Sequence, residues 1–276
     1  MPWFPDFASA AELARRQVRE EGHADPVAQY LAALSSGSSH DLDVVWPGDV
    51  QVYDPRAGLV RGHHQLRDFV RRNTAWLASQ HARVETVAST TVGRRAAVEI
   101  LAHLESDGQA TVWPVAVVAE SPDDRSVIFR TYCSQWPVDG RRHPRPSLLE
   151  PMREALSGVV GRFQTALRDG DVPAVTGAFA EDGYLRESFG PHDAHRGAAE
   201  LGTYFTTCFS AGGGIELQHC TVTDDGTRCA VEYNCVRWGS ETISPQAGVA
   251  VFERRADDLL AAVRLYDDVE PPAALR

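Results

Sequence analysis

Two kinds of apolar pattern follow one another along this chain. Apolar residues recur at every third or fourth position, the spacing of an amphipathic helix, over residues 27–34, 63–77, 150–170 and 198–209. β-Branched and aromatic residues, separated by short polar turns, dominate residues 82–90, 96–104, 111–120, 126–136, 215–223, 229–238, 247–255 and 259–268. Helices come first and strands come last in each half, which predicts an α+β fold built twice.

Capping residues mark the ends of the predicted helices. Asp25 and Pro26 have the character of an N-cap followed by a first-turn proline. In the second half, Leu156, Phe163 and Leu167 share one face of a helix that we predict over residues 150–170. This helix in the second half is longer than its counterpart in the first.

The two halves of the chain repeat one sequence. AVEIL in the first half matches AVEYN in the second, and IFRTYCSQWP matches AVRLYDDVEP. The offset between matched residues is 133 for Glu99 and Glu232 and 134 for Tyr132 and Tyr266. Chance does not hold one offset over such a length, so we infer an internal duplication.

The duplication sets the expected domain organisation. We predict an N-terminal extension over 1–22, a first domain over 23–138, a polar, proline-rich linker over 139–148 and a second domain over 149–276. The extension holds PWFPDF, a strap or lid, and AAELARRQVREE, a short surface helix; a loosely packed leader is the alternative. Each domain should wrap a curved antiparallel sheet on its helices around a pocket. The two domains should pair as an intramolecular pseudo-dimer.

Charge and composition exclude several function classes. The net charge of −11 repels phosphate backbones and argues against nucleic-acid binding. No apolar run approaches the roughly 18 residues of a membrane span, and the N-terminus does not look like a signal peptide. Five cysteines without a CxxC motif indicate neither a disulfide framework nor a zinc site. We therefore expect a cytoplasmic protein without membrane or nucleic-acid partners.

Histidines do not form a convincing metal motif. The rings of adjacent His63 and His64 diverge, and His192 with His195 fits a polar pocket rim better than a metal site. We predict no metal and no cofactor.

One segment carries a family resemblance. QVYDPRAGLVRGHHQLRDF resembles the ketosteroid-isomerase and SnoaL-like branch of the nuclear-transport-factor-like superfamily, and the resemblance extends over both repeats. It implies two tandem cone-shaped, cystatin-like domains, each with an internal apolar cavity. The same fold hosts isomerases, cyclases, epoxide hydrolases, dehydratases and plain binding domains, so the resemblance fixes the fold better than the reaction.

In the first copy, the resemblance implies a candidate catalytic site. Tyr30 precedes Asp54 by 24 residues, which is the isomerase spacing of a hydrogen-bond donor and the catalytic base. Trp113 stands where the isomerases have their second donor, a protonated aspartate; an indole donates one hydrogen bond but cannot supply that proton. The structural alternatives are a turn-forming Asp54 and core positions for Tyr30 and Trp113.

In the second copy, the same spacing places Phe163 and Glu187 at the positions of the tyrosine and the base. Glu216 lies on the next strand, where polyether epoxide hydrolase–cyclases carry a second carboxylate; the alternative is a solvent-facing Glu216. Our candidates for substrate contact are Tyr132, His81, Phe163, His192 and Tyr266. For the paired residues Glu99 and Glu232 we favour a salt bridge or domain contact, and for Asp267 and Asp268 a sheet end.

These residues support three hypotheses. A carboxylate in an apolar pocket has a raised pKa and becomes a competent acid or base near neutral pH. The leading hypothesis is thus a cofactor-independent acid–base enzyme that isomerises, cyclises or dehydrates its substrate. The family resemblance, rather than the residues, implies that this substrate is a small apolar carbonyl compound of natural-product type. The alternatives are an epoxide hydrolase–cyclase of the polyether type and a non-catalytic ligand-binding or assembly protein.

Overall fold

The structure is a computed structural model that describes residues 25–271 except 107, 191 and 192. The predicted extension over 1–22 and the candidate His192 lie outside the described residues. The chain divides into two compact units, residues 1–133 and 134–276.

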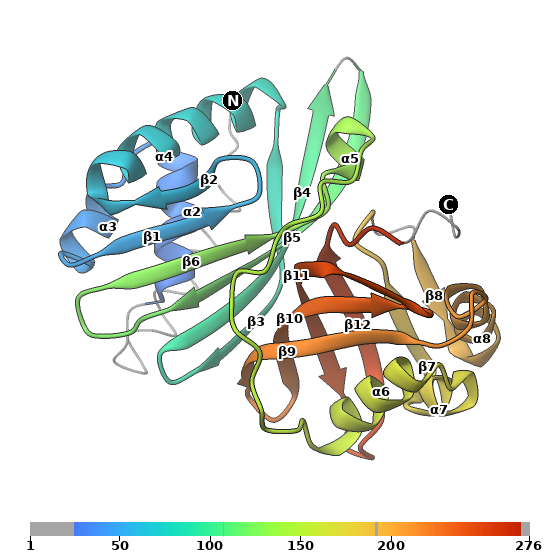
Figure 1. Cartoon of the computed structure of the whole chain (residues 1–276). Helices are drawn as coiled ribbons and strands as arrows, with labels where there is room; N and C mark the ends of the chain where they lie inside the picture. The colour runs from blue at the N-terminus through green and yellow to red at the C-terminus, as the bar shows by residue number, and fades with distance from the viewer. Residues whose placement is uncertain (1–24, 107, 191–192, 272–276) are drawn as a thin grey trace. The chain divides into compact units, whose positions relative to one another are not determined.

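The first unit packs helices on a six-stranded sheet (Figure 1). Its helices are α2 (Pro26–Ser36), α3 (His40–Val45) and α4 (Gly62–Ser79). Its strands are β1 (Val50–Asp54), β2 (Gly58–Arg61), β3 (Arg83–Val92), β4 (Arg95–Ser106), β5 (Gln109–Glu120) and β6 (Val127–Tyr132). They lie in the order β2-β1-β6-β5-β4-β3.

The second unit repeats this arrangement. Its helices are α5 (Trp136–Asp139), α6 (Gly158–Asp169), α7 (Val172–Gly177) and α8 (Gly197–Cys208). Its strands are β7 (Phe179–Arg186), β8 (Ala194–Arg196), β9 (Ile215–Asp224), β10 (Arg228–Trp238), β11 (Glu241–Arg254) and β12 (Leu260–Asp267). The order β8-β7-β12-β11-β10-β9 matches that of the first unit strand for strand.

The predicted α+β class and the two tandem domains are confirmed, with one refinement to the sheet. β1 pairs with β6, and β7 with β12, in parallel, so each sheet is mixed rather than wholly antiparallel. A parallel pair requires a crossover connection, and here the long helix and four strands of the unit lie between its two members. This pairing brings the first and last strands of each unit together.

Helix α6 is shorter than the sequence pattern predicts. It begins at Gly158, whereas we predicted a helix from residue 150. Gly158 has a φ of +60°, a left-handed conformation that glycine adopts at little cost and that interrupts a helix. Upstream of it, the backbone N–H of Met152 donates to the carbonyl of His219 on β9, at 2.8 Å. Before residue 158, Leu156 packs against the core whereas Met152 and Ala155 are exposed, so the apolar spacing there does not mark the buried face of a helix.

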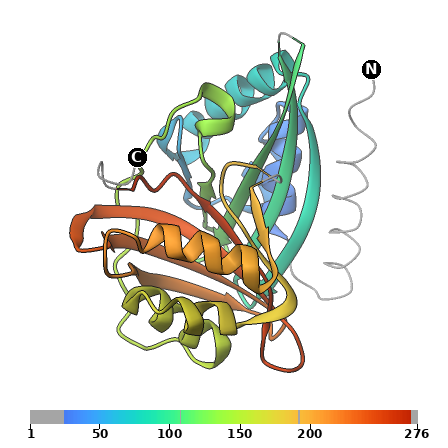
Figure 2. The same ribbon diagram turned by 90° about the vertical axis from the view of Figure 1, so that its right-hand side faces the viewer.

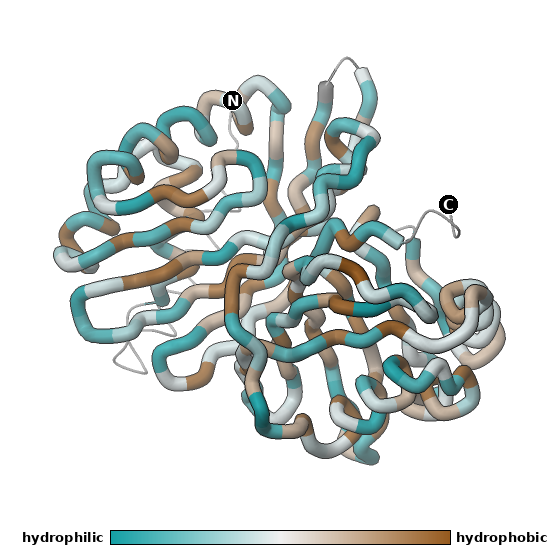
Figure 3. Tube along the Cα trace, viewed as in Figure 1, coloured by the Kyte–Doolittle hydropathy of each residue, from teal (hydrophilic) through white to brown (hydrophobic). Residues whose placement is uncertain are grey.

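The core of the second unit lies between its helices and one face of its sheet (Figure 2). Figure 3 shows apolar positions concentrated on the strands. Val159, Phe163 and Leu167 of α6 are buried in this core. Burying each of these side chains contributes roughly 1.5–3 kcal/mol, so packing holds the helix in place. No helix within the described part of the chain combines the length and the hydropathy that crossing a bilayer requires.

The polar segment that begins the second unit is held by one buried carboxylate. Asp268, 4% exposed, accepts hydrogen bonds from the Ser134 hydroxyl at 2.7 Å and from the backbone N–H groups of Gln135 at 3.0 Å and His143 at 2.7 Å. Further along, the Arg145 carbonyl accepts from the Ala247 N–H at 2.7 Å. Much of the predicted linker over 139–148 therefore packs on the second unit.

Replacing Asp268 should release this segment. Asp268→Ala leaves buried donors without an acceptor, at about 1–3 kcal/mol each, so we expect about 3 kcal/mol of destabilisation or more. Trypsin should also cleave faster after the exposed Arg141. Chemical denaturation and timed proteolysis test this, with Asp257→Ala, an exposed carboxylate, as the control. Equal stability and equal cleavage of the two variants would contradict the role of Asp268.

Candidate functional site

The second unit contains a cavity of about 630 Å³ between α6, α8 and the concave face of its sheet. This volume lies in the range of small-molecule sites. Most of the lining is apolar or aromatic, including Phe163, Leu185, Phe205, Leu217, Trp238 and Phe252. The polar side chains that line it include Glu187, Tyr204, Tyr233 and Asp267. An apolar chamber with a few polar groups suits a small, largely apolar molecule.

Glu187 follows the end of β7 and faces this cavity. One carboxylate oxygen, Oε1, lies 2.9 Å from Nε2 of His195 on the neighbouring strand β8. The His195 ring stacks on Tyr204 of α8, with centroids 4.2 Å apart, and this fixes the imidazole. Burial raises the pKa of Glu187, although the hydrogen bond from His195 opposes the shift. Glu187 is thus a positioned carboxyl group that exchanges protons closer to neutral pH than an ordinary glutamate.

A second acid lies on the adjacent part of the sheet. Tyr233 of β10 and Asp267 of β12 flank the same residue of the strand between them, Gly248 of β11. The Tyr233 hydroxyl is hydrogen-bonded to Oδ2 of Asp267. A Cβ at position 248 would lie 2.7 Å from both the Tyr233 hydroxyl oxygen and the Asp267 Cβ. Only a glycine between them permits this contact.

The surroundings of Asp267 favour its neutral form. Its Oδ1 accepts hydrogen bonds from the Ser188 hydroxyl at 3.1 Å and the Val269 N–H at 3.2 Å. Burial nevertheless outweighs these hydrogen bonds and raises the pKa of Asp267. Burial also raises the pKa of Tyr233 well above its ordinary value. Tyr233 and Asp267 together form a hydrogen-bonding acid pair on the cavity wall.

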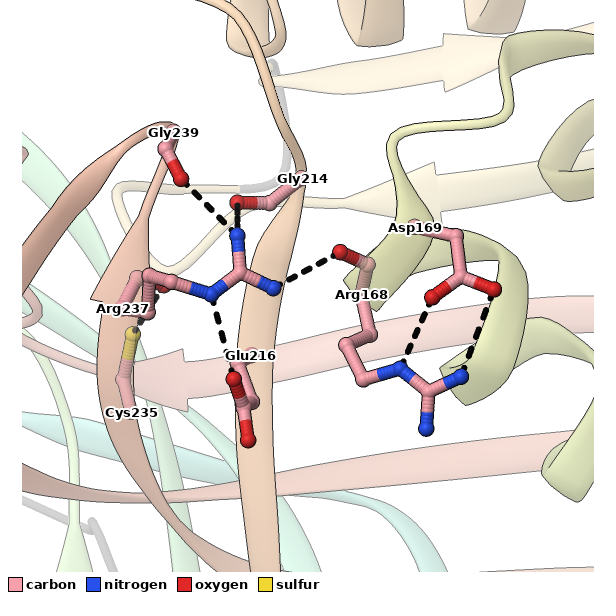
Figure 4. Close-up of polar contacts among 7 residues, drawn as sticks. All are labelled: Arg168, Asp169, Gly214, Glu216, Cys235, Arg237 and Gly239. Atoms are coloured by element: carbon pink, nitrogen blue, oxygen red, sulfur yellow. Dashed lines mark hydrogen bonds and ion pairs between the residues drawn. The ribbon is translucent and has the colours of Figure 1, made fainter.

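Glu216 belongs to a different cluster (Figure 4). Its neighbours Ile215 and Leu217 line the cavity, so strand alternation turns the Glu216 side chain to the other face of the sheet. There its carboxylate lies 3.1 Å from Nε of Arg237, whose guanidinium also donates to the carbonyls of Gly239 at 2.8 Å and Arg168 at 2.9 Å. The structure does not bring Glu216 and Glu187 together at one cavity. This arrangement holds a turn and a helix end in place.

The sequence matches the model of the SnoaL-like domain twice, over residues 27–128 and 160–263. The chain belongs to the SnoaL-like family. Each matched range lies within one of the two structural units. No curated protein matches the sequence.

Several solved structures resemble one SnoaL-like domain of the chain. An NTF2-like protein of unknown function from Cytophaga hutchinsonii is 14% identical, with a TM-score of 0.33, over 42% of this chain and 95% of that one. A SnoaL-like protein of unknown function from Burkholderia thailandensis is 14% identical, with a TM-score of 0.33, over 38% and 88%. The epoxide hydrolase/cyclase-like enzyme SalBIII, of pyran ring formation in the polyether salinomycin, is 18% identical, with a TM-score of 0.33, over 40% and 87%. At such scores these likenesses do not identify a reaction.

In the first SnoaL-like domain, each of the three predicted catalytic residues takes part in a turn or in aromatic packing. Oδ1 of Asp54 accepts from the backbone N–H groups of Arg56 at 2.9 Å and Ala57 at 2.8 Å, which is the geometry of a turn. Tyr30 is 1% exposed and stacks on Phe129 at 4.5 Å; burial and the nearby Asp54 raise its pKa well above the ordinary value. Trp113 is also buried and packs edge-on against Trp76. The catalytic role of these three residues stays a prediction.

Of the described candidates for substrate contact, one lines the cavity of the second domain and the others lie elsewhere. Phe163 lines the cavity of the second SnoaL-like domain. Tyr266 does not, because its neighbours Leu265 and Asp267 occupy the cavity face; the Arg186 guanidinium lies 4.8 Å from its ring. Tyr132 is buried at the matching position of the first domain, and the ring of the exposed His81 contacts the carbonyl of Glu105.

The paired glutamates on the central strands are both buried. Glu232 accepts a hydrogen bond from the hydroxyl of Thr221 on the neighbouring strand. Among the described residues, no three His, Cys, Asp or Glu side chains gather as a metal site. All five cysteines are free thiols, and burial raises the pKa of Cys208 and Cys235 at the cavity to about 12. These two thiols are therefore poor nucleophiles.

Sequence reasoning missed the acid pair and underrated His195. Tyr233 and Asp267 are 34 residues apart, and only strand pairing brings them together. One signal was available, because the first copy has apolar Ile100 and Cys133 at the matching positions. Differences between the copies would have indicated the polar wall of the cavity.

The requirement for a glycine at position 248 can be tested by substitution. Gly248→Ala should displace Tyr233 or Asp267, break their hydrogen bond and destabilise the protein by about 1–3 kcal/mol. Gly202→Ala, in α8, is the matched control, since a Cβ there meets nothing within 4 Å and an alanine should stabilise the helix by up to about 1 kcal/mol. Thermal denaturation and a crystal structure of each variant measure these effects. Equal effects of the two substitutions would contradict the close-contact role of Gly248.

The raised pKa of Asp267 predicts a pH-dependent stability. The folded state retains the Asp267 proton above the ordinary pKa of 3.8, so the wild type should lose stability as pH rises from there through the raised value. Asp267→Asn, which cannot ionise, should lose less stability over this window, whereas Asp257→Asn should follow the wild type. Urea denaturation at a series of pH values decides this. A wild-type slope retained in Asp267→Asn would refute the assignment.

Proposed function

We propose that the second domain is a cofactor-independent acid–base enzyme that isomerises, cyclises or dehydrates a small apolar carbonyl compound. The observation that carries the proposal is that two carboxyl groups with raised pKa values, Glu187 and Asp267, line one apolar cavity. Groups of this kind move protons in a site that excludes water. The family resemblance of the sequence implies a fold that hosts isomerases and cyclases among other functions, which agrees with the proposal.

Glu187 serves as the general base. His195 occupies Oε1, and Oε2 has no hydrogen-bond partner among the described residues, so that oxygen is available to a substrate. The carboxylate removes a proton from the carbon next to the substrate carbonyl. The C–H electron pair becomes the C=C bond of an enolate, and negative charge moves to the carbonyl oxygen. His195 acts as a positioning residue that keeps the carboxylate aimed at the cavity.

Tyr233 and Asp267 together provide a hydrogen-bond donor for the carbonyl oxygen of the substrate. When Asp267 is neutral, its proton lies on Oδ2, since Oδ1 already accepts two hydrogen bonds. That proton is donated to the Tyr233 oxygen, and the Tyr233 hydroxyl proton is then free to point into the cavity. A donor aimed at the developing enolate oxygen stabilises it, and a donor of this kind is worth roughly 10²–10³ in rate.

The first test needs no natural substrate. Proton exchange next to the carbonyl of 2-tetralone, an apolar bicyclic ketone, is followed in D₂O by NMR. Glu187→Gln should lower the catalysed rate by about 10²-fold or more, because it removes the base. Glu181→Gln, an exposed carboxylate on the strand that precedes Glu187, and Asp54→Asn should stay within about twofold of the wild type. Loss of exchange in Asp54→Asn alone would move the site to the first domain.

The pH profile provides an independent check. Only ionised Glu187 acts as a base, and only neutral Asp267 leaves the Tyr233 proton to the substrate, so the exchange rate should rise with pH through the pKa of Glu187 and fall where Asp267 loses its proton. Because burial raises that pKa, the midpoint should lie above the ordinary value of 4.5, and Glu187→Gln should abolish the rise. A midpoint at or below that ordinary value would contradict the role of Glu187.

The same two carboxyl groups favour a second candidate function, epoxide opening. Glu187 would take a proton from a water molecule while the oxygen of that water attacks an epoxide carbon. The Tyr233–Asp267 pair would protonate the epoxide oxygen as its bond to that carbon breaks. Hydrolysis of indene oxide in H₂¹⁸O, lost in Asp267→Asn, together with no ketone exchange, would select this function. Binding of both probes without either reaction would select the non-catalytic alternative.

A further inference from the structure

The cavity of the second domain has one positively charged side chain among its described lining residues. This is Arg142, which lies in the segment that Asp268 holds against the domain, directly before the anchored His143. The rest of the lining is apolar, neutral and polar, or acidic. A single guanidinium in such a chamber distinguishes one end of a ligand from the other.

The contacts of Arg142 fix its position but leave donors available. Nη1 donates to the carbonyl of Val269, and the guanidinium carbon lies 4.3 Å from the ring centroid of Phe189, another lining residue. No other hydrogen bond and no ion pair of Arg142 occurs among the described residues. An arginine has five N–H donors in a planar fork, so most of them can serve a bound molecule. Stacking and the Val269 contact hold that fork in place before a ligand arrives.

Charge selects the ligand. Arg142 lowers the pKa values of both Glu187 and Asp267 without pairing with either, so its field reaches the proposed reaction site. The fork of a guanidinium matches a carboxylate in two parallel hydrogen bonds. A doubly charged phosphate would add repulsion from Glu187 that one arginine does not offset. A single negative charge on a flat group fits best.

We infer that the cavity takes an apolar molecule with one carboxylate, and that Arg142 binds this carboxylate while the apolar body lies against the aromatic lining. The inference deepens the proposed function and rests on it for the identity of this molecule as the substrate. Arg142 is here a specificity-determining residue; Glu187 and the Tyr233–Asp267 pair carry out the chemistry.

A matched pair of ligands tests the inference. 1-Naphthaleneacetate and 1-naphthaleneacetamide have nearly the same shape and differ in charge. By isothermal titration calorimetry, the wild type should bind the acid about tenfold or more tighter than the amide. Arg142→Met should remove this preference, Arg142→Lys should retain part of it, and Arg141→Met, an exposed neighbour, should retain it fully. Circular dichroism confirms that each variant is folded.

The outcomes separate this inference from the proposed function. Equal affinity of the wild type for acid and amide, or no binding of the acid, overturns the role of Arg142 whether or not the variants fold. A preference that persists in folded Arg142→Met overturns it as well. If the preference fails while Glu187-dependent exchange of 2-tetralone is present, only the inference falls. If Arg142-dependent preference is present without exchange or epoxide opening, the proposed function falls and the carboxylate site remains.

Discussion

The hydrogen bond between Tyr233 and Asp267 spans a strand to which neither residue belongs. Two side chains on alternate strands of a sheet normally have a third side chain between them. Gly248 removes that obstacle, and the apolar chamber supplies the low polarity that favours a neutral acid. In the proposed function, this pair would supply the acid on one wall of the chamber and Glu187 the base on another.

Two adjacent aspartates at the end of β12 have separate tasks. Asp267 faces the cavity, whereas Asp268 is buried among donors from the segment that begins the second unit. Through Asp268, that segment brings Arg142 to the cavity lining. The segment between the two sequence repeats thus contributes to the lining of the cavity as well as joining two domains.

The sequence was sufficient for the duplication, the α+β class and the family, because apolar spacing and repeated offsets are local signals. Spacing also selected Glu187, which lines the cavity. It did not select Asp267, because the resemblance directs attention to positions that both copies share, and here the first copy has Cys133. The start of α6 at Gly158 also eluded the pattern, since Met152, Ala155 and Leu156 keep a helical spacing in a segment that is not helical, where Met152 and Ala155 are exposed.

The opposed directions of Asp267 and Asp268 limit how β12 can change in evolution. Successive side chains of a strand alternate between faces, so a single-residue insertion or deletion within β12 would turn Asp268 toward the chamber or Asp267 away from it. An insertion would put Tyr266 in the chamber position and remove the cavity acid, whereas a deletion would put Val269 in the anchor position and release the preceding segment. Insertions in the turn between β11 and β12 carry no such cost. Length variation among descendants of this protein should therefore collect in that turn and spare the strand.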